Sequence, residues 1–311
     1  MNIKRLIKNG FRLFYDNDYR FLIMNQRKKF HSMSDEEFLK RKFRALMGYD
    51  LDLDNPQTYN EKLQWLKLHD RNPEYITMVD KYAVKQYVAD KIGEQYIIPT
   101  LGVWDRFDDI DFNSLPNQFV LKCTHDSGGL VICKDKSEFD KEKARKKINQ
   151  SLNRNYYYVG REWPYKNVKP RIIAEQYMED AETRELRDYK FFCFDGVAKA
   201  IFIATDRGSS EETKFDFFDM NFNHLDFTNG HPNATPYPAK PKSFELMIDL
   251  ASVLSQEIPH VRVDFYEVNG HVYFGEMTFY HWSGFTAFDP PKWDKTFGDW
   301  IKFPDKKTIR E

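Results

Sequence analysis

The sequence predicts an α+β fold in which a helical N-terminal region precedes antiparallel β-sheets. Up to about residue 92, apolar residues recur at the spacing of amphipathic helices. From Phe119 onward, short apolar runs are separated by turn residues, which is typical of strands. Tight turns such as Asp195-Gly196 join neighbouring runs into hairpins, and the sequence shows no series of βαβ units.

Three helices are predicted in the N-terminal region, over residues 34–47, 59–68 and 73–91. The third is capped by Asn72, has proline in its first turn and ends before Gly93, which is the usual order of start and stop residues. The other predicted elements are strands over 118–123, 130–133, 171–178, 187–194 and 197–205, helices over 140–151 and 243–257, and a hairpin near the C-terminus.

Composition limits the class of protein. The chain has 311 residues, of which 41% are hydrophobic, enough for a sizeable core in one or two domains. Its net charge of −1 argues against nucleic acid as a partner. Cys123, Cys133 and Cys193 lack paired spacing, so neither a disulfide framework nor a zinc site is expected. With no signal peptide and no long apolar run, we expect a cytoplasmic protein.

The first 30 residues are basic, with eight Lys or Arg residues against Asp16 and Asp18, interleaved with apolar residues. Such a segment can lie on an anionic membrane, which predicts a peripheral contact with the inner face of the cell membrane. The alternative is a helix docked on the protein with a solvated basic edge.

The most informative segment is the predicted hairpin over residues 261–278, which turns at Asn269-Gly270. Its strands carry Arg262, Asp264 and Glu276 at positions where apolar residues would be expected. Charges inside such strands are unfavourable unless they are paired. Two carboxylates facing each other would form a site of hard oxygens, suited to Mg²⁺ that holds a polyphosphate.

The register of this hairpin decides whether the two carboxylates meet. A strict two-residue turn pairs Asp264 with Gly275 and places Glu276 on the wrong face. A three-residue or bulged turn pairs Asp264 with Glu276, and Arg262 and Thr278 then share that face. The alternative interpretation is an ordinary solvated outer face of the strands.

A basic strand and a glycine loop lie upstream. Lys122 projects from strand 118–123, and the loop that follows ends in Ser127-Gly128-Gly129, whose backbone N–H groups can close on a phosphate. The loop lacks the GKS/T ending of a Walker P-loop. By itself it is also consistent with a glycine-rich hairpin turn.

Two later strands add candidate ligands. Glu175, near the end of strand 171–178, can accept from an adenine amino group or a ribose hydroxyl, with Tyr177 and Met178 as a wall. Lys190 needs an anionic partner, either Asp188 or a phosphate. The segment Lys214-Phe215-Asp216 repeats this pattern more weakly.

The order of these parts resembles the ATP-grasp superfamily, and four motifs resemble its TupA-like family. These motifs lie at residues 59–68, 79–85, 119–123 and 275–279, and the resemblance covers roughly residues 55 to 300. It implies an ATP-grasp fold, in which two α+β subdomains with antiparallel sheets sandwich ATP. The implied domains are a basic helical segment over 1–54, a helical region over 55–112 and an ATP-grasp domain over 113–311, with subdomains at about 113–174 and 175–290 and an extension over 291–311.

The resemblance also implies roles for individual residues. Arg262 and Lys122 would be catalytic, and Asp264, Glu276 and Thr278 would ligate Mg²⁺; most ATP-grasp enzymes have Asn at the position of Thr278. The implied ATP-binding residues are Lys81, Lys122, Thr124, His125, Ser127, Gly128, Gly129, Glu175, Gln176, Tyr177, Met178, Lys190 and Lys214.

The implied activity is that of an ADP-forming carboxylate–amine ligase with ATP and Mg²⁺ as cofactors. Its partners would be a glycan carboxylate, such as a uronic acid, and an amino acid or peptide, in the synthesis of a bacterial surface polysaccharide such as a capsule. Two alternatives remain: a glycosyltransferase, and a phosphotransferase on the same fold that stops after phosphoryl transfer.

Overall fold

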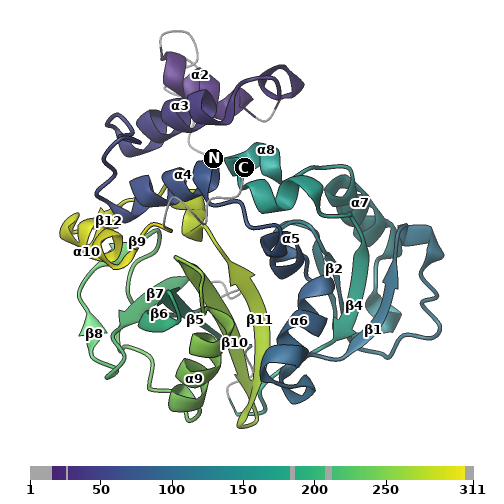
Figure 1. Cartoon of the computed structure of the whole chain (residues 1–311). Helices are drawn as coiled ribbons and strands as arrows, with labels where there is room; N and C mark the ends of the chain where they lie inside the picture. The colour runs from purple at the N-terminus through teal and green to yellow at the C-terminus, as the bar shows by residue number, and fades with distance from the viewer. Residues whose placement is uncertain (1–15, 26, 183–185, 207–211, 305–311) are drawn as a thin grey trace.

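The computed structural model describes residues 16–25, 27–182, 186–206 and 212–304, and it contains two principal β-sheets (Figure 1). All neighbouring strands in both sheets are antiparallel. The four-stranded sheet has the order β1 (Thr100–Trp104), β4 (Ile172–Gln176), β2 (Phe119–Cys123), β3 (Leu130–Cys133). The six-stranded sheet has the order β11 (His271–Thr278), β10 (Val261–Val268), β5 (Asp188–Phe194), β6 (Val197–Thr205), β7 (Lys214–Phe218), β8 (His224–Leu225). A two-stranded sheet pairs β12 (Phe288–Asp289) with β9 (Thr228–Asn229).

Helices surround and separate these sheets, and α5 and α6 lie between the two large ones (Figure 1). The helices are α2 (Asn17–Met24), α3 (Asp35–Met47), α4 (Tyr59–His69), α5 (Glu74–Val79), α6 (Ala83–Ile92), α7 (Lys141–Leu152), α8 (Tyr157–Gly160), α9 (Phe244–Leu254) and α10 (Lys292–Trp300). Short 3₁₀ segments include η5 (Trp163–Asn167) and η6 (His281–Gly284). In the described part of the chain, no helix combines the length and apolarity that crossing a bilayer requires.

The predicted α+β class is confirmed, as are the main predicted strands to within a residue or two of their ends. Strand β1 of the four-stranded sheet lies ahead of residue 113, within the region over 55–112 that was predicted to be helical. The predicted domain boundary at residue 113 stays a prediction. The basic segment over residues 1–30 lies partly outside the described residues, which begin at Asp16 and omit Gln26. Its membrane contact therefore also stays a prediction.

The prediction of one continuous helix over residues 73–91 is wrong. The backbone of Asp80 is extended, with φ −76° and ψ 111°, and it separates α5 from α6. Its carboxylate accepts from the backbone N–H of Tyr82 at 2.9 Å and of Ala83 at 3.3 Å, which caps the new helix. Arg171 donates to the same carboxylate at 2.7 Å. Lys81 consequently lies in the connection between two helices.

Strand β5 explains why the six-stranded sheet needs charged partners in its interior. Every residue of this strand is buried, including Asp188 and Lys190. One face of the sheet packs against α9, whose residues Phe244, Met247 and Leu254 are fully buried. Since a buried charge without a partner is strongly unfavourable, Lys190 requires acidic groups from neighbouring strands.

The hairpin of β10 and β11 brings the two expected carboxylates together by an unexpected route. Val268 pairs with His271, so the turn at Asn269-Gly270 has only two residues. The register nevertheless shifts further along the strands, where Asp264 pairs with Glu276. A β-bulge at Gly275 supplies the extra residue. The expected pairing is confirmed, but the bulge lies in the strand and the turn is the short one.

Gly275 is expected to be required at this bulge. A Cβ added there would lie 3.1 Å from the backbone oxygen of Asp264 and 3.1 Å from the Tyr266 ring. We expect Gly275→Ala to lower the free energy of unfolding by about 1–3 kcal/mol, because the strand must move to admit the methyl group. Urea denaturation followed by circular dichroism measures this loss.

Gly270→Asn is the matched control in the same hairpin. Gly270 has φ +78°, which asparagine tolerates, and nothing lies within 4 Å of an added Cβ. We expect a smaller loss for this variant. Equal losses for the two variants would show that the bulge has no special need for glycine.

Candidate active site

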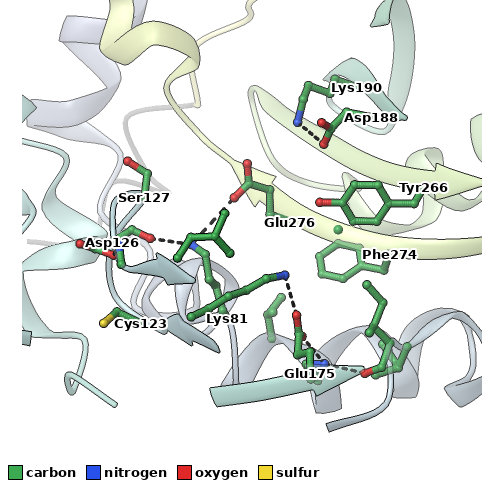
Figure 2. Close-up of a pocket in the computed structure, with 18 residues that line it drawn as sticks. Lys81, Cys123, Asp126, Ser127, Glu175, Asp188, Lys190, Tyr266, Phe274 and Glu276 are labelled. Atoms are coloured by element: carbon green, nitrogen blue, oxygen red, sulfur yellow. Dashed lines mark hydrogen bonds and ion pairs between the residues drawn. The ribbon is translucent and has the colours of Figure 1, made fainter. Parts of the chain in front are cut away.

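A cavity of about 210 Å³ lies between the two sheets and is lined by both of them, by α6 and by the loop after β2 (Figure 2). Its lining includes as many lysines as acidic residues, so cations and anions balance when no ligand is bound. The charged lining residues are Lys81, Lys85, Lys122, Lys190, Asp126, Glu175, Asp188 and Glu276.

One end of the cavity is apolar. Tyr266 and Phe274 extend from the hairpin on the same side of the cavity (Figure 2). Val84 of α6 and the pair Ile97-Ile98 complete this wall. The apolar wall suits a flat ring, whereas the charged side suits a polyanion. Sequence reasoning did not identify these five residues, because apolar side chains at helix or strand spacing are usually core residues.

Two lysines hold Glu175 on β4. Lys122 of β2 and Lys85 of α6 each form an ion pair with its carboxylate, with N–O distances of 2.5 Å. Burial would raise the pKa of Glu175, but Lys122 and Lys85 together lower it. Lys85 also donates to the carbonyl of Ile98 at 2.6 Å. Lys85 belongs to the motif over residues 79–85, but only its ion pair with Glu175 identifies it as a residue of this cavity.

Lys81 connects the glycine loop to the hairpin. Its Nζ donates to the carbonyl oxygen of Asp126 at 2.7 Å and lies 3.9 Å from Oε2 of Glu276 (Figure 2). Its backbone N–H donates to the carbonyl of Thr124 at 3.0 Å. These contacts are possible because Lys81 lies in the break between α5 and α6, outside both helices.

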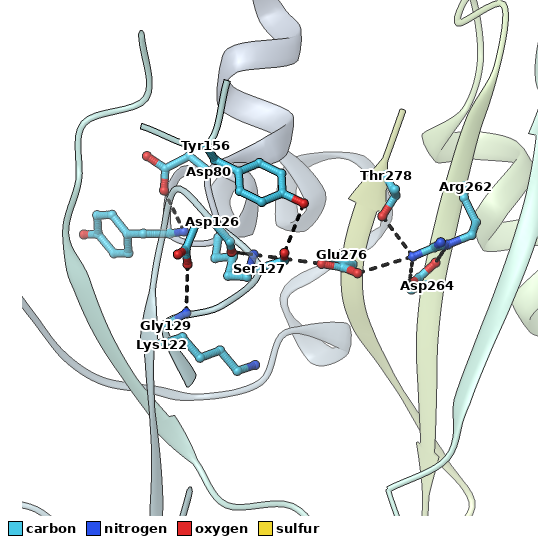
Figure 3. A network of polar contacts seen from close by, with 12 residues as sticks. Asp80, Lys122, Asp126, Ser127, Gly129, Tyr156, Arg262, Asp264, Glu276 and Thr278 are labelled. Atoms are coloured by element: carbon cyan, nitrogen blue, oxygen red, sulfur yellow. Dashed lines mark hydrogen bonds and ion pairs between the residues drawn. The ribbon is translucent and has the colours of Figure 1, made fainter. Parts of the chain in front are cut away.

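The glycine loop is held in a defined shape. The buried carboxylate of Asp126 accepts from the backbone N–H of Gly129 at 3.0 Å and from the hydroxyl of Ser151. The hydroxyl of Ser127 donates to Tyr156 at 3.1 Å (Figure 3). A Cβ on Gly129 would lie 2.5 Å from Ser151 and from Cys123, so a larger residue does not fit. Its predicted closure on a phosphate stays a prediction.

Beside the cavity, Arg262 organises a buried cluster of charges (Figure 3). Its Nε and Nη2 donate to both oxygens of Asp264, at 2.7 and 2.8 Å, in the two-point geometry that suits a carboxylate. Lys190 also donates to Asp264 and lies 3.0 Å from Asp188. Asp264 is 0% exposed, so the interpretation of this face as an ordinary solvated surface is wrong.

The guanidinium of Arg262 has further contacts. Nη2 donates to the hydroxyl of Thr278 at 3.0 Å and lies 3.3 Å from Glu276. Nη1 lies 2.7 Å from Nδ1 of His281, which must accept because arginine only donates. Burial and Arg262 hold the pKa of His281 well below its usual range, so Nε2 carries the proton and donates to Asn229 at 3.0 Å.

Glu276 faces the cavity and carries the clearest electrostatic signature. Burial would raise its pKa, but Lys81, Lys190, Arg262 and Lys122 together lower it to about 2. Its side chain is 39% exposed, so the surrounding cations are the deciding influence. Because Glu276 stays ionised, its carboxylate is suited to bind a metal cation that a phosphate also ligates.

The donor groups for Mg²⁺ fit in type. Asp264 and Glu276 are directly paired across the hairpin, and the hydroxyl of Thr278 lies on the same face. Magnesium takes one or two carboxylates together with phosphate and water oxygens. Among the described residues, no cluster of three or more His, Cys, Asp or Glu side chains is arranged for a metal. Ligation would therefore need oxygens from a bound ligand, and the metal assignment stays a prediction.

The structure brings some predicted site residues into the cavity and places others away from it. Those in the lining are Lys81, Lys122, Ser127, Gly129, Glu175, Lys190 and Glu276. Arg262, Asp264 and Thr278 lie next to Glu276 and Lys190 in the buried cluster. Outside the lining lie Thr124, His125, Gly128, Gln176, Tyr177, Met178 and Lys214.

His125 and Lys214 show what separates these groups. The ring of His125 is buried and contacts the carbonyls of Ser151 and Arg154 at 3.1 and 3.0 Å, so it supports the loop from behind. Lys214, at the start of β7, has its Nζ 3.9 Å from Glu212. Their roles toward a nucleotide stay predictions.

Comparisons with known proteins agree with the sequence motifs. A family model described as TupA-like ATPgrasp matches residues 61–302. A search of curated proteins found no match.

Several solved structures are similar in part. D-alanine–D-alanine ligase from Bacillus anthracis, complexed with ATP, is 15% identical with a TM-score of 0.37, over 65% of this chain and 53% of that one. The same enzyme from Helicobacter pylori is 15% identical with a TM-score of 0.42, over 79% and 70%. The ATP-grasp ligase PsnB, complexed with minimal precursor, is 7% identical with a TM-score of 0.37, over 67% and 54%. The chain thus spans about half the length of the first of these structures.

The lowered pKa of Glu276 predicts a pH-dependent contribution to stability. A carboxyl whose folded pKa lies near 2, below its ordinary value of 4.5, stabilises the fold above pH 4.5 and loses this effect as pH falls toward 2. We expect Glu276→Gln to unfold at a lower temperature than the unsubstituted protein at pH 7. The difference should shrink as the pH approaches 2.

Thermal unfolding at pH 7, 4 and 2.5 measures this difference. Glu142→Gln is the control, because Glu142 is 79% exposed and its contact with Arg145 is long, at 3.8 Å. A difference for Glu276→Gln that persists unchanged at pH 2.5 would contradict the electrostatic interpretation.

Proposed function

Because the chain belongs to the TupA-like ATP-grasp family, we propose that it is an ATP-dependent ligase that joins a carboxylate to an amine. We further propose that it acts in bacterial surface polysaccharide synthesis and joins an amino acid or peptide to a uronic acid. The observation that carries the proposal is the convergence of Lys81, Lys85, Lys122 and Lys190 on one cavity that also has an apolar wall.

The nucleotide fits this division of the cavity. The adenine ring would lie against the apolar wall formed by Val84, Ile97-Ile98, Tyr266 and Phe274. The lysines would bind the phosphates. In the described structure each of these lysines has an acidic partner. A polyphosphate would therefore compete with carboxylates for the lysines.

The chain's own residues support phosphoryl transfer by neutralising charge. Lys190 and Arg262 carry the positive charge beside the cavity, and Asp264 fixes both in orientation. Nη2 of Arg262 has three acceptors, Asp264, Glu276 and Thr278, so a phosphoryl group that meets Nη2 would compete with them. In the described structure Arg262 therefore holds Asp264 and Glu276 in place.

Asp264, Glu276 and Thr278 would hold Mg²⁺, which supplies further charge neutralisation on the phosphates. A substrate carboxylate oxygen would attack the γ-phosphorus, and the bond to ADP would break. The amine nitrogen would then attack the acyl carbon, release phosphate and lose a proton to form the amide. Water must be excluded meanwhile, and the loop 124–129 is the proposed cover.

Substitution of the lysines tests the nucleotide site. We expect Lys122→Met to weaken MgATP binding by roughly 10- to 100-fold, because one charge-assisted contact to phosphate is lost. We expect Lys214→Met to change it less than about twofold, because Lys214 lies outside the cavity lining. Isothermal titration calorimetry measures both constants, with exposed Lys199→Met as the control. A larger effect of Lys214→Met would restore its predicted role at the nucleotide.

The reaction itself is tested by phosphate release from MgATP with pairs of uronates and amino acids. The proposal expects ADP and phosphate in equal amounts, with release that depends on both the carboxylate and the amine. Release that needs the carboxylate or a hydroxyl acceptor alone, without an amine, indicates the phosphotransferase. Consumption of a nucleotide sugar without use of ATP indicates the glycosyltransferase.

A further inference from the structure

The segment η6, directly after β11, has an unusual backbone. Trp282, Ser283 and Gly284 have φ values of +49°, +55° and +64°, so three successive residues are left-handed. This conformation is unfavourable for residues that carry a Cβ, and more so for a bulky one. Such strain persists only where the surrounding structure holds it, and it is common at ligand sites.

Buried polar contacts hold this segment on both sides of Trp282. His281 is fixed between Arg262 and Asn229, as described above. The Nζ of Lys67 donates to the carbonyl of Ser283 at 2.8 Å, and Gln64 donates to the carbonyl of Gly284 at 2.7 Å. His281, Lys67 and Gln64 are buried, whereas Trp282 is 42% exposed.

The Trp282 ring is supported from below. A Cβ on Gly230 would lie 2.9 Å from the indole Nε1, so the ring rests closely against that glycine. The rings of Phe215 and His231 lie 6.1 and 5.9 Å from it, centroid to centroid. A large apolar surface is therefore held rigidly and still presented outward, which core packing alone does not require.

A chain of rings connects Trp282 to the buried charges. Phe215 lies 4.6 Å from Phe202, centroid to centroid, and the Cζ of Arg262 lies 5.5 Å from the Phe202 centroid. Along the backbone, His281, which contacts Arg262, directly precedes Trp282. The exposed indole thus belongs to the same face of the six-stranded sheet as Arg262 and Lys190.

We propose that Trp282 is the stacking platform for a pyranose ring of the carboxylate substrate and determines specificity for cyclic uronates over open-chain acids. The inference rests on the proposed function. The apolar C–H face of a pyranose would cover the indole, while its carboxylate would point toward the charges beside Arg262. An open-chain dicarboxylate also offers a carboxylate to these charges but has no ring face to stack.

The backbone strain at Trp282 provides a sharp test. Glycine adopts φ +49° freely, so Trp282→Gly removes the ring and relieves the strain at once. We expect this variant to keep or raise the unfolding temperature. Its KM for methyl glucuronide should rise by about tenfold, with the KM for MgATP unchanged. Trp282→Phe should restore most of the affinity, because it keeps an aromatic face.

Tyr237→Ala is the matched control, since Tyr237 is 52% exposed and stacks on His224 at the edge strand β8. It should leave the KM for methyl glucuronide unchanged. Open-chain glutarate should bind the unsubstituted protein and Trp282→Gly equally. A lower unfolding temperature for Trp282→Gly with unchanged methyl glucuronide affinity would assign Trp282 a structural role and overturn the proposal.

Calorimetric titration with methyl glucuronide separates this inference from the proposed function. If no acceptor supports phosphate release but the titration shows binding that Trp282→Gly weakens, the ligase proposal fails and the platform stands. The pyranose platform is overturned if the unsubstituted protein binds no uronate. It is also overturned if Trp282→Gly weakens the binding of benzoate, a flat aromatic acid, but not that of methyl glucuronide.

Discussion

The pairing of Asp264 with Arg262 and Lys190 is the interaction on which the rest of the site depends. These charges lie within strands that are otherwise apolar, and Asp264 has no contact with solvent. Removing one partner would leave an uncompensated charge in the sheet interior, which is far more unfavourable than the pair itself. The charges therefore fix the strands around them, and the bulge at Gly275 is what brings Glu276 into the same cluster.

The same requirement for pairing shapes the cavity. Lys85 and Lys122 share Glu175, and Lys81 lies between the glycine loop and Glu276, so each of these lysines already has a carboxylate within 4 Å. A ligand with several negative charges would compete with these carboxylates for the same lysines. The cavity thus gathers four lysines in one place although its lining, like the whole chain, is nearly balanced in charge.

The segment after the hairpin is also held in place, because Arg262 contacts His281. That contact ties the end of β11 to η6, where Lys67 and Gln64 fix a left-handed backbone from below. The electrostatic cluster and the exposed Trp282 are thus parts of one rigid arrangement. Buried hydrogen bonds maintain the strain, and the side chain that carries it is the one presented outward.

The sequence by itself determined the α+β class, the hairpin at Asn269-Gly270 and the charges at 262, 264 and 276, because these follow from local periodicity and turn chemistry. Only the tertiary structure decided the features that depend on distant partners. The carboxylate of Asp80, at the break between α5 and α6, also accepts from Arg171, 91 residues away. Lys85 became a site residue through Glu175 on another element. In each case the deciding energy is a contact between residues far apart in the chain, which spacing along the sequence does not encode.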